Sequence, residues 1–76
     1  MFAMRKMIDS AEHQKLVKRL IAARNKAGLR QEDVARILHV DQSFISKIES
    51  GFIRIDLVQI KEFARAYKTP LSLFIP

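Results

Sequence analysis

The sequence predicts one all-α domain built from five helices. Apolar residues recur every three or four positions in each long segment, which is the spacing of one helix face. We expect no strands, no internal repeat and no low-complexity linker in the 76 residues. Residues that favour helix ends separate the segments: Ser10 or Asp9, Gly28, Asp41, Gly51, Asp56 and the pair Thr69-Pro70.

The first helix is expected from about residue 10 to residue 27, with Gly28 as its terminator. Residues 1–9 have no clean period, so we interpret them as a mobile N-terminal arm ahead of a domain at residues 10–76. The arm also holds apolar side chains, so it could instead pack on the domain or on a second subunit. The inward stripe of the first helix is formed by Leu16, Val17, Leu20, Ile21 and Ala27.

Residues 31–51 predict two short helices separated by a tight bend. The first opens with acidic side chains, which suit the positive end of a helix dipole. Asp41 is expected to N-cap the second helix, residues 42–50, and Gly51 to end it in a left-handed conformation. In the helix that begins at residue 31, the inward stripe is formed by Val34, Ala35, Ile37 and Leu38. In the helix at residues 42–50, it is formed by Ile45 and Ile48.

This pair of helices has the pattern of a helix-turn-helix. The small residue Ala35 lies where a larger side chain would keep the two helices apart. The outward face of the second helix presents amides, hydroxyls and one amine, which are the groups that contact base edges in a major groove. These residues are Gln42, Ser43, Ser46 and Lys47.

A loop at residues 52–55 leads into the last two expected helices. Asp56 caps the fourth helix, with Gln59 in a capping-box position, and the inward side is formed by Leu57, Ile60, Phe63, Ala64 and Tyr67. Thr69-Pro70 is a second start signal, a cap followed by proline at the first helical position. The fifth helix is a short apolar turn that contains Leu71, Leu73, Phe74 and Ile75.

Composition excludes several classes of function. The chain has no cysteine, so disulfides and thiolate metal sites are not available. Its two histidines, His13 and His39, lack metal-ligand spacing, and two glycines cannot form a phosphate-binding loop. We therefore expect no metal, no cofactor and no enzyme activity. No apolar run is long enough to span a membrane and the N-terminus is no secretory signal, so a cytoplasmic protein is expected.

The net charge of +6 is unevenly placed. Residues 1–30 hold eight basic and two acidic side chains, whereas residues 31–76 hold six of each. A basic surplus favours polyanions such as nucleic acid. A solvated basic helix face explains it equally well, so charge alone does not decide the function.

The chain resembles the lambda-repressor-like, or XRE-type, helix-turn-helix family from about Leu16 to Phe74. The resemblance rests on Arg24, Gln31, Ala35, Val40, Ile45, the run Ser46-Lys47-Ile48-Glu49, and Gly51. It implies a compact five-helix domain with the helix-turn-helix at its second and third helices. It also implies a sequence-specific regulator of transcription that binds double-stranded DNA, with the third helix in the major groove.

The resemblance assigns roles by position. Gln42, Ser43, Ser46 and Lys47 would contact bases, and Gln31 would contact a backbone phosphate, with Arg30 and Arg54 on either side. Arg24 would form a structural ion pair with Glu49. A homodimer on a palindromic operator is the expected assembly, and candidates for its interface are Phe52, Ile53, Phe74 and Ile75.

The sequence departs from the family pattern at two places, and two other functions compete with DNA binding. His39 stands where the family usually has glycine, and Phe52-Ile53 where it usually has polar or basic residues. The main alternative is a protein-binding regulator on the same fold, such as an antitoxin-type partner module, which the neutral charge of residues 31–76 favours. A membrane-surface helix at residues 1–28 is weaker, because Glu12 and Arg24 interrupt its faces.

Overall fold

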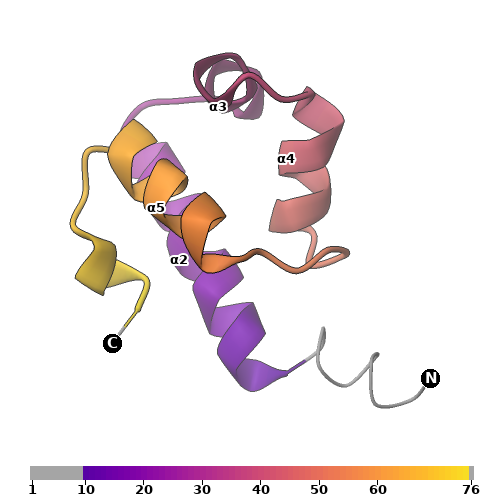
Figure 1. Ribbon diagram of the computed structural model, residues 1–76, viewed down its shortest axis with the longest axis vertical. Coiled ribbons are helices and arrows are strands. Elements are labelled where there is room, and N and C mark those ends of the chain that lie inside the picture. The colour runs from indigo at the N-terminus through magenta and orange to yellow at the C-terminus, as the bar shows by residue number, and fades with distance from the viewer. Residues whose placement is uncertain (1–9, 76) are drawn as a thin grey trace.

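The computed structural model describes residues 10–75, and these form four α-helices and one 3-10 turn (Figure 1). The elements are α2 (Ala11–Lys26), α3 (Gln31–Leu38), α4 (Gln42–Glu49), α5 (Leu57–Ala66) and the 3-10 turn η1 (Leu71–Leu73). The described residues contain no strand, which confirms the all-α prediction. The predicted arm, residues 1–9, lies outside the described residues.

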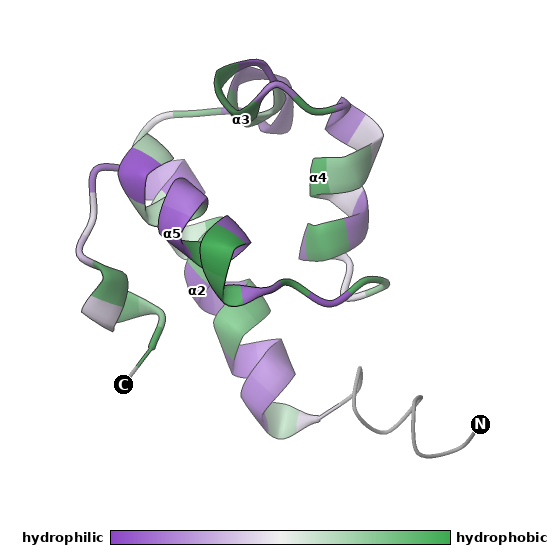
Figure 2. Cartoon of the chain, viewed as in Figure 1, coloured by the Kyte–Doolittle hydropathy of each residue, from purple (hydrophilic) through white to green (hydrophobic). Residues whose placement is uncertain are grey.

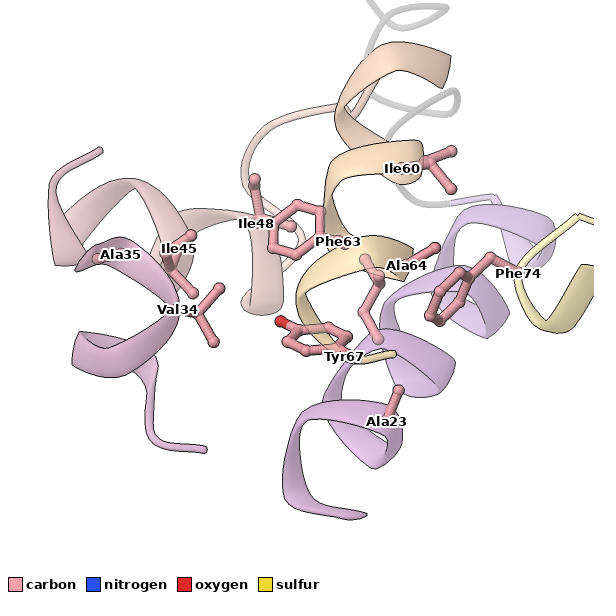
Figure 3. Packing of buried hydrophobic residues seen from close by; sticks show 11 residues of the cluster. Ala23, Val34, Ala35, Ile45, Ile48, Ile60, Phe63, Ala64, Tyr67 and Phe74 are labelled. Atoms are coloured by element: carbon pink, nitrogen blue, oxygen red, sulfur yellow. The ribbon is translucent and has the colours of Figure 1, made fainter. Parts of the chain in front are cut away.

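All four described helices bury residues in one core, which Figure 3 shows from close by. Ile45 and Ile48 of α4 are 0% exposed, as the helical spacing predicts. They belong to one cluster with buried side chains of α2, α3 and α5. The remaining fully buried side chains are Leu20 of α2, Val34 of α3 and Phe63 of α5.

Three residues of the predicted inward stripes face solvent instead. Ile37 is 47% exposed and Leu57 is 52% exposed, and Ala27 is exposed at the end of α2. In α3 the positions spaced i, i+3, i+4 and i+7 begin at Gln31, so Ile37 falls beside the buried face and not on it. Leu57 is the first residue of α5, one turn ahead of the first buried residue, Ile60. These three predictions are wrong.

The fifth predicted helix is also wrong, because the chain makes only one tight turn after Pro70. The N–H groups of Leu73 and Phe74 donate to the carbonyls of Pro70 and Leu71, three residues earlier, at 3.0 and 2.9 Å. Residues three apart eclipse in such a turn, so Leu71 and Phe74 both pack on the core. A single turn therefore suffices to bury the aromatic ring.

Each described α-helix ends with the same backbone hydrogen bond, from the second or third residue past the helix to a carbonyl five positions earlier. The bonds are Leu29 to Arg24, Val40 to Ala35, Phe52 to Lys47 and Thr69 to Ala64, at 2.9 to 3.1 Å. This ending needs a left-handed residue just before the donor. Gly28 and Gly51 supply it with φ of 75° and 80°, but His39 and Lys68 also adopt it, with φ of 59° and 53°.

Two of the four predicted caps form. The Thr69 cap is wrong, because the final turn begins at Leu71 with Pro70 at its N-cap. The Ser10 hydroxyl accepts from the His13 N–H at 3.1 Å, and Asp56 and Gln59 exchange side-chain and backbone bonds at 2.8 and 2.9 Å. Asp41 occupies the N-cap of α4, but its side chain makes no capping hydrogen bond.

The left-handed Lys68 gives a test of the fold. A side chain costs about 1–2 kcal/mol in this conformation, while glycine loses about 0.5–1 kcal/mol more conformational entropy on folding. Lys68→Gly should therefore raise the free energy of unfolding by about 0.5–1 kcal/mol in urea denaturation. The matched control is Lys61→Gly within α5, which should lower it by about 1 kcal/mol. Destabilisation by both substitutions would contradict the left-handed assignment.

Candidate nucleic-acid interface

A partly buried ion pair ties α2 to the last turn of α4. The Nε of Arg24 donates to Oε2 of Glu49 at 2.7 Å, and Nη2 donates to Oε1 at 3.1 Å. The two side chains are only 13% and 7% exposed. The hydrogen bond with Glu49 raises the pKa of Arg24, against the smaller opposing effect of burial, so the guanidinium stays charged.

Two further hydrogen bonds extend the pair into a network. The Nη1 of Arg24 donates to the carbonyl of Leu29 at 2.9 Å, and the Nε2 of Gln31 donates to Oε1 of Glu49 at 2.9 Å. The network thus joins α2, the loop after it, the first residue of α3 and the end of α4. It fixes α4 relative to the rest of the domain.

The Tyr67 hydroxyl lies in the core near this network. Burial is the main reason that the pKa of Tyr67 is raised, and the Glu49 carboxylate raises it further. Its oxygen is buried without a hydrogen-bond partner in the described part of the chain. The group therefore stays neutral and completes the apolar packing, where its ring lies 5.8 Å from that of Phe63.

The outward face of α4 is polar and nearly neutral. Gln42, Ser43 and Lys47 are exposed and Ser46 is partly buried, on the side opposite Ile45 and Ile48. Glu49, the acidic residue of α4, is held in the ion pair, so Lys47 is the charged group on this face of the described helix. The arrangement leaves one amide, two hydroxyls and one amine for a ligand.

The two predicted flanking arginines differ in their surroundings. Arg30 precedes α3 and is 72% exposed, with Nη2 3.4 Å from Oε2 of Glu32 and Nε 3.5 Å from Oδ2 of Asp33. Arg54 is exposed in the loop between α4 and α5, and it has no carboxylate within ion-pair distance among the described residues. Ion pairs as long and exposed as those of Arg30 are weak, so both guanidinium groups are accessible to an anion.

The four candidates for a subunit interface separate into two groups. Phe52 is 73% exposed and Ile75 is 36% exposed. Phe74 is only 4% exposed within the core, and Ile53 packs against that core. Phe74 is therefore wrong as an interface residue, because its ring is already covered by its own chain. The sequence interpretation missed Val58, which is 65% exposed.

The turn between α3 and α4 is made by His39, whose φ of 59° and ψ of 45° are left-handed. Histidine adopts this conformation more readily than most side chains, so the departure from glycine leaves the turn intact. The described residues contain no group of three His, Cys, Asp or Glu side chains that could hold a metal ion. No helix between residues 10 and 75 is long and apolar enough to cross a membrane.

Comparison with known families adds one match. A family model described as helix-turn-helix covers residues 20–74, which is more than half of the chain. The matched range contains α3, α4 and both members of the ion pair. Searches of curated proteins and of solved structures gave no match.

The ion pair makes a prediction about stability. Arg24→Met should lower the free energy of unfolding by about 1–3 kcal/mol, because the partly buried Glu49 carboxylate loses its charged partner and keeps only the hydrogen bond from Gln31. The double variant Arg24→Met/Glu49→Met should lose less than the two single losses combined. Urea denaturation of the wild type, Arg24→Met, Glu49→Met and the double variant gives the coupling energy between the two side chains. Arg36→Met is the control, since Arg36 is 72% exposed in its ion pair with Asp33 and should contribute at most about 1 kcal/mol. Equal losses for Arg24→Met and Arg36→Met would contradict the buried pair.

Asp33 makes a prediction about pH. The N–H of Arg30 donates to its carboxylate at 2.8 Å and is the main reason that the pKa of Asp33 lies below its ordinary value of 3.8. A lowered pKa in the folded state stabilises the protein above that ordinary value, and the stabilisation is lost as the pH falls through the folded pKa. Asp33→Asn should therefore show a shallower loss of stability as the pH falls below about 4, measured by urea denaturation. Parallel pH profiles would contradict the shift.

Proposed function

The chain belongs to the helix-turn-helix family of the XRE type, and from that premise we propose a transcriptional regulator that binds double-stranded DNA with α4 in the major groove. The family consists of DNA-binding domains and not of enzymes. The single observation that supports the assignment to α4 is its polar face, Gln42, Ser43 and Lys47, turned outward opposite two fully buried isoleucines.

Each side chain of that face has a base edge that suits it. The amide of Gln42 matches the N6 and N7 groups of adenine, and the amine of Lys47 reaches O6 and N7 of guanine. The hydroxyls of Ser43 and Ser46 donate or accept, so they suit either kind of edge. Ser46 is partly buried, and we assign it a smaller share of the contact.

Phosphate contacts would come from both ends of the helix pair. Gln31 uses one N–H of its amide on Glu49, and the second N–H of the same nitrogen is available to a phosphate oxygen. Arg30 lies beside it, and Arg54 lies in the loop after α4. A phosphate displaces the weak pairs of Arg30 with Glu32 and Asp33 at little cost, because those pairs are exposed.

The assembly we propose is a homodimer on a palindromic operator. One eight-residue helix with four contacting side chains distinguishes only a few base pairs. Two copies related by a two-fold axis would place their α4 helices in successive major grooves, about 34 Å apart. The symmetry of the operator would then mirror the symmetry of the protein.

A protein-binding regulator, for example an antitoxin-type partner module, is the second candidate. The observation that favours it is the low positive charge around α4, where Lys47 is the exposed cation and Arg30 faces two carboxylates. The salt dependence of duplex binding distinguishes the two functions. Phosphate contacts release counterions, so the DNA affinity of a regulator that uses them falls steeply as the ionic strength rises.

Duplex selection followed by titration tests the proposal. The protein should select a palindromic sequence from a random pool of duplexes. Gln42→Ala should then lose about 1–3 kcal/mol of discrimination at one base pair per half-site. Arg54→Ala should weaken all duplexes alike and reduce the slope of log affinity against log salt by about 0.9 per subunit. Lys61→Ala, an exposed charge on α5, serves as the control for general electrostatics.

Two results would contradict this reading of the interface. Unchanged sequence preference in Gln42→Ala would mean that α4 does not contact bases. Absence of duplex binding at low salt would reject the proposed function and favour the protein-binding alternative.

A further inference from the structure

A hollow of about 570 Å³ opens between the first half of α2, the end of the α4–α5 loop and the residues that follow η1. Figure 1 shows this half of α2 extending past α5 toward its N-terminal end. Cavities that hold small molecules measure about 300–1,000 Å³. The hollow is therefore large enough for a small ligand, and the proposed reading of DNA by α4 does not use it.

One side of the hollow is apolar. Phe74 of the core and the partly buried Leu16 and Ile55 line it, together with Ile75, which is 36% exposed. Figure 2 shows hydrophobic colour at the chain end after η1, in contrast to the hydrophilic colour on much of the first half of α2. An apolar body that covered this side would be stabilised by the surface removed from water.

The other side of the hollow is cationic. Lys15 and Arg19 lie about one turn apart on α2, and Arg54 comes from the α4–α5 loop. All three side chains are exposed, and none forms an ion pair within residues 10–75. Glu12 is the single acidic side chain of the lining. A hollow lined mainly by one sign of charge concentrates ions of the other sign, so this one favours an anion.

The lining also contains a polar atom that lacks a partner. The Nε2 of His13 is buried and makes no hydrogen bond within the described part of the chain, although buried polar atoms are nearly always paired. Because the His13 side chain lines the hollow, a small turn of its ring would bring this nitrogen to a hydrogen-bonding group of a ligand. The unsatisfied atom is a second feature that indicates a polar ligand group at this place.

We propose that the hollow binds a small amphipathic carboxylate, an acid with one anionic group and an apolar body. The carboxylate would pair with Lys15, Arg19 and Arg54, and the body would cover the apolar side. A DNA backbone would use the cations but leave the apolar side uncovered, and a neutral or cationic ligand would leave the cations unpaired. The site also gives a role to Lys15 and Arg19, since the proposed DNA contacts use only Arg30 among the basic side chains of residues 1–30.

Arg54 connects the hollow with DNA binding. In the proposed DNA complex its guanidinium contacts a phosphate, and in the hollow the same group faces the carboxylate of the acid. An acid bound there would compete with the phosphate for Arg54 and weaken the DNA complex. This regulatory part of the inference rests on the proposed function, whereas the binding of the acid does not.

Titrations of the full chain with three probes test the ligand class. Octanoate has a carboxylate and an apolar chain, octylamine has a similar chain with a cation, and acetate has the carboxylate almost alone. At neutral pH and constant ionic strength, octanoate should bind at least about tenfold more tightly than either of the other two, because it alone uses both sides of the hollow. Amide NMR spectra should show saturable shifts at the residues that line the hollow. Equal affinity for octanoate and octylamine, or shifts centred on another surface, would overturn the inference.

Two variants of equal net charge locate the anion. Lys15→Gln/Arg19→Gln removes two cations from the lining, and Lys18→Gln/Lys26→Gln removes two exposed cations of α2 that do not line the hollow. The first should weaken octanoate binding about tenfold or more, and the second by less than about twofold. Circular dichroism checks that both keep the helical content of the wild type. Equal losses would mean that octanoate responds only to net charge, which contradicts a site at the hollow.

The competition for Arg54 is measured with the selected duplex. Saturating octanoate should weaken duplex binding by the wild type about tenfold, compared with acetate at the same concentration. It should change the affinity of Arg54→Ala by less than about twofold, because that variant has no guanidinium to withdraw. Unchanged affinity of the wild type, or equal losses in the wild type and Arg54→Ala, would overturn the competition.

Failure of this inference is distinguishable from failure of the proposed function. A chain that binds duplex but does not distinguish octanoate from octylamine overturns the acid site and leaves DNA binding intact. A chain that binds octanoate selectively at the hollow but binds no duplex supports the site and rejects the proposed function.

Discussion

The bidentate pair between Arg24 and Glu49 is the interaction on which the remaining structure depends. It closes the end of α4 onto α2, and it recruits the carbonyl of Leu29 and the amide of Gln31. A buried ion pair adds little net stability over apolar packing of the same shape, since both charges lose their hydration. Its effect is on geometry: any other placement of α4 would leave a charge unpaired, so one orientation of the outward polar face is selected.

Local signals predicted most of the fold. Helical spacing placed Ile45 and Ile48 in the core, and glycines located the ends of α2 and α4. The errors have a common origin, because periodicity identifies residues on one face but not how far the neighbouring helix extends along it. Ile37 and Leu57 lie at the edges of such faces and remain exposed. Phe74 shows the reverse, since a short apolar turn that looked free for a partner is seated in its own core.

Helical spacing predicted the candidate site only where it depends on one helix, and the family resemblance supplied the Arg24–Glu49 pair between α2 and α4. The outward placement of Gln42, Ser43 and Lys47 follows from the buried pair on the opposite side of α4. The bond from Gln31 to Glu49 joins residues 18 positions apart and becomes visible only when α3 and α4 are packed. Val58 was missed because the first turn of a helix has too few residues to show which face it belongs to. Which side chains contact bases, phosphates or a second copy stays a prediction.

The two ends of α4 are restrained very differently. Its last turn is closed by the ion pair and by the bond from Phe52 to Lys47, whereas at its first turn the Asp41 side chain makes no capping bond. The turn that holds Gln42 and Ser43 is therefore the less anchored one. In the DNA complex that we propose, the last turn of α4 would set the angle of the helix and its first turn would adjust to the groove, so the entropy cost of ordering that turn would fall on recognition and not on folding.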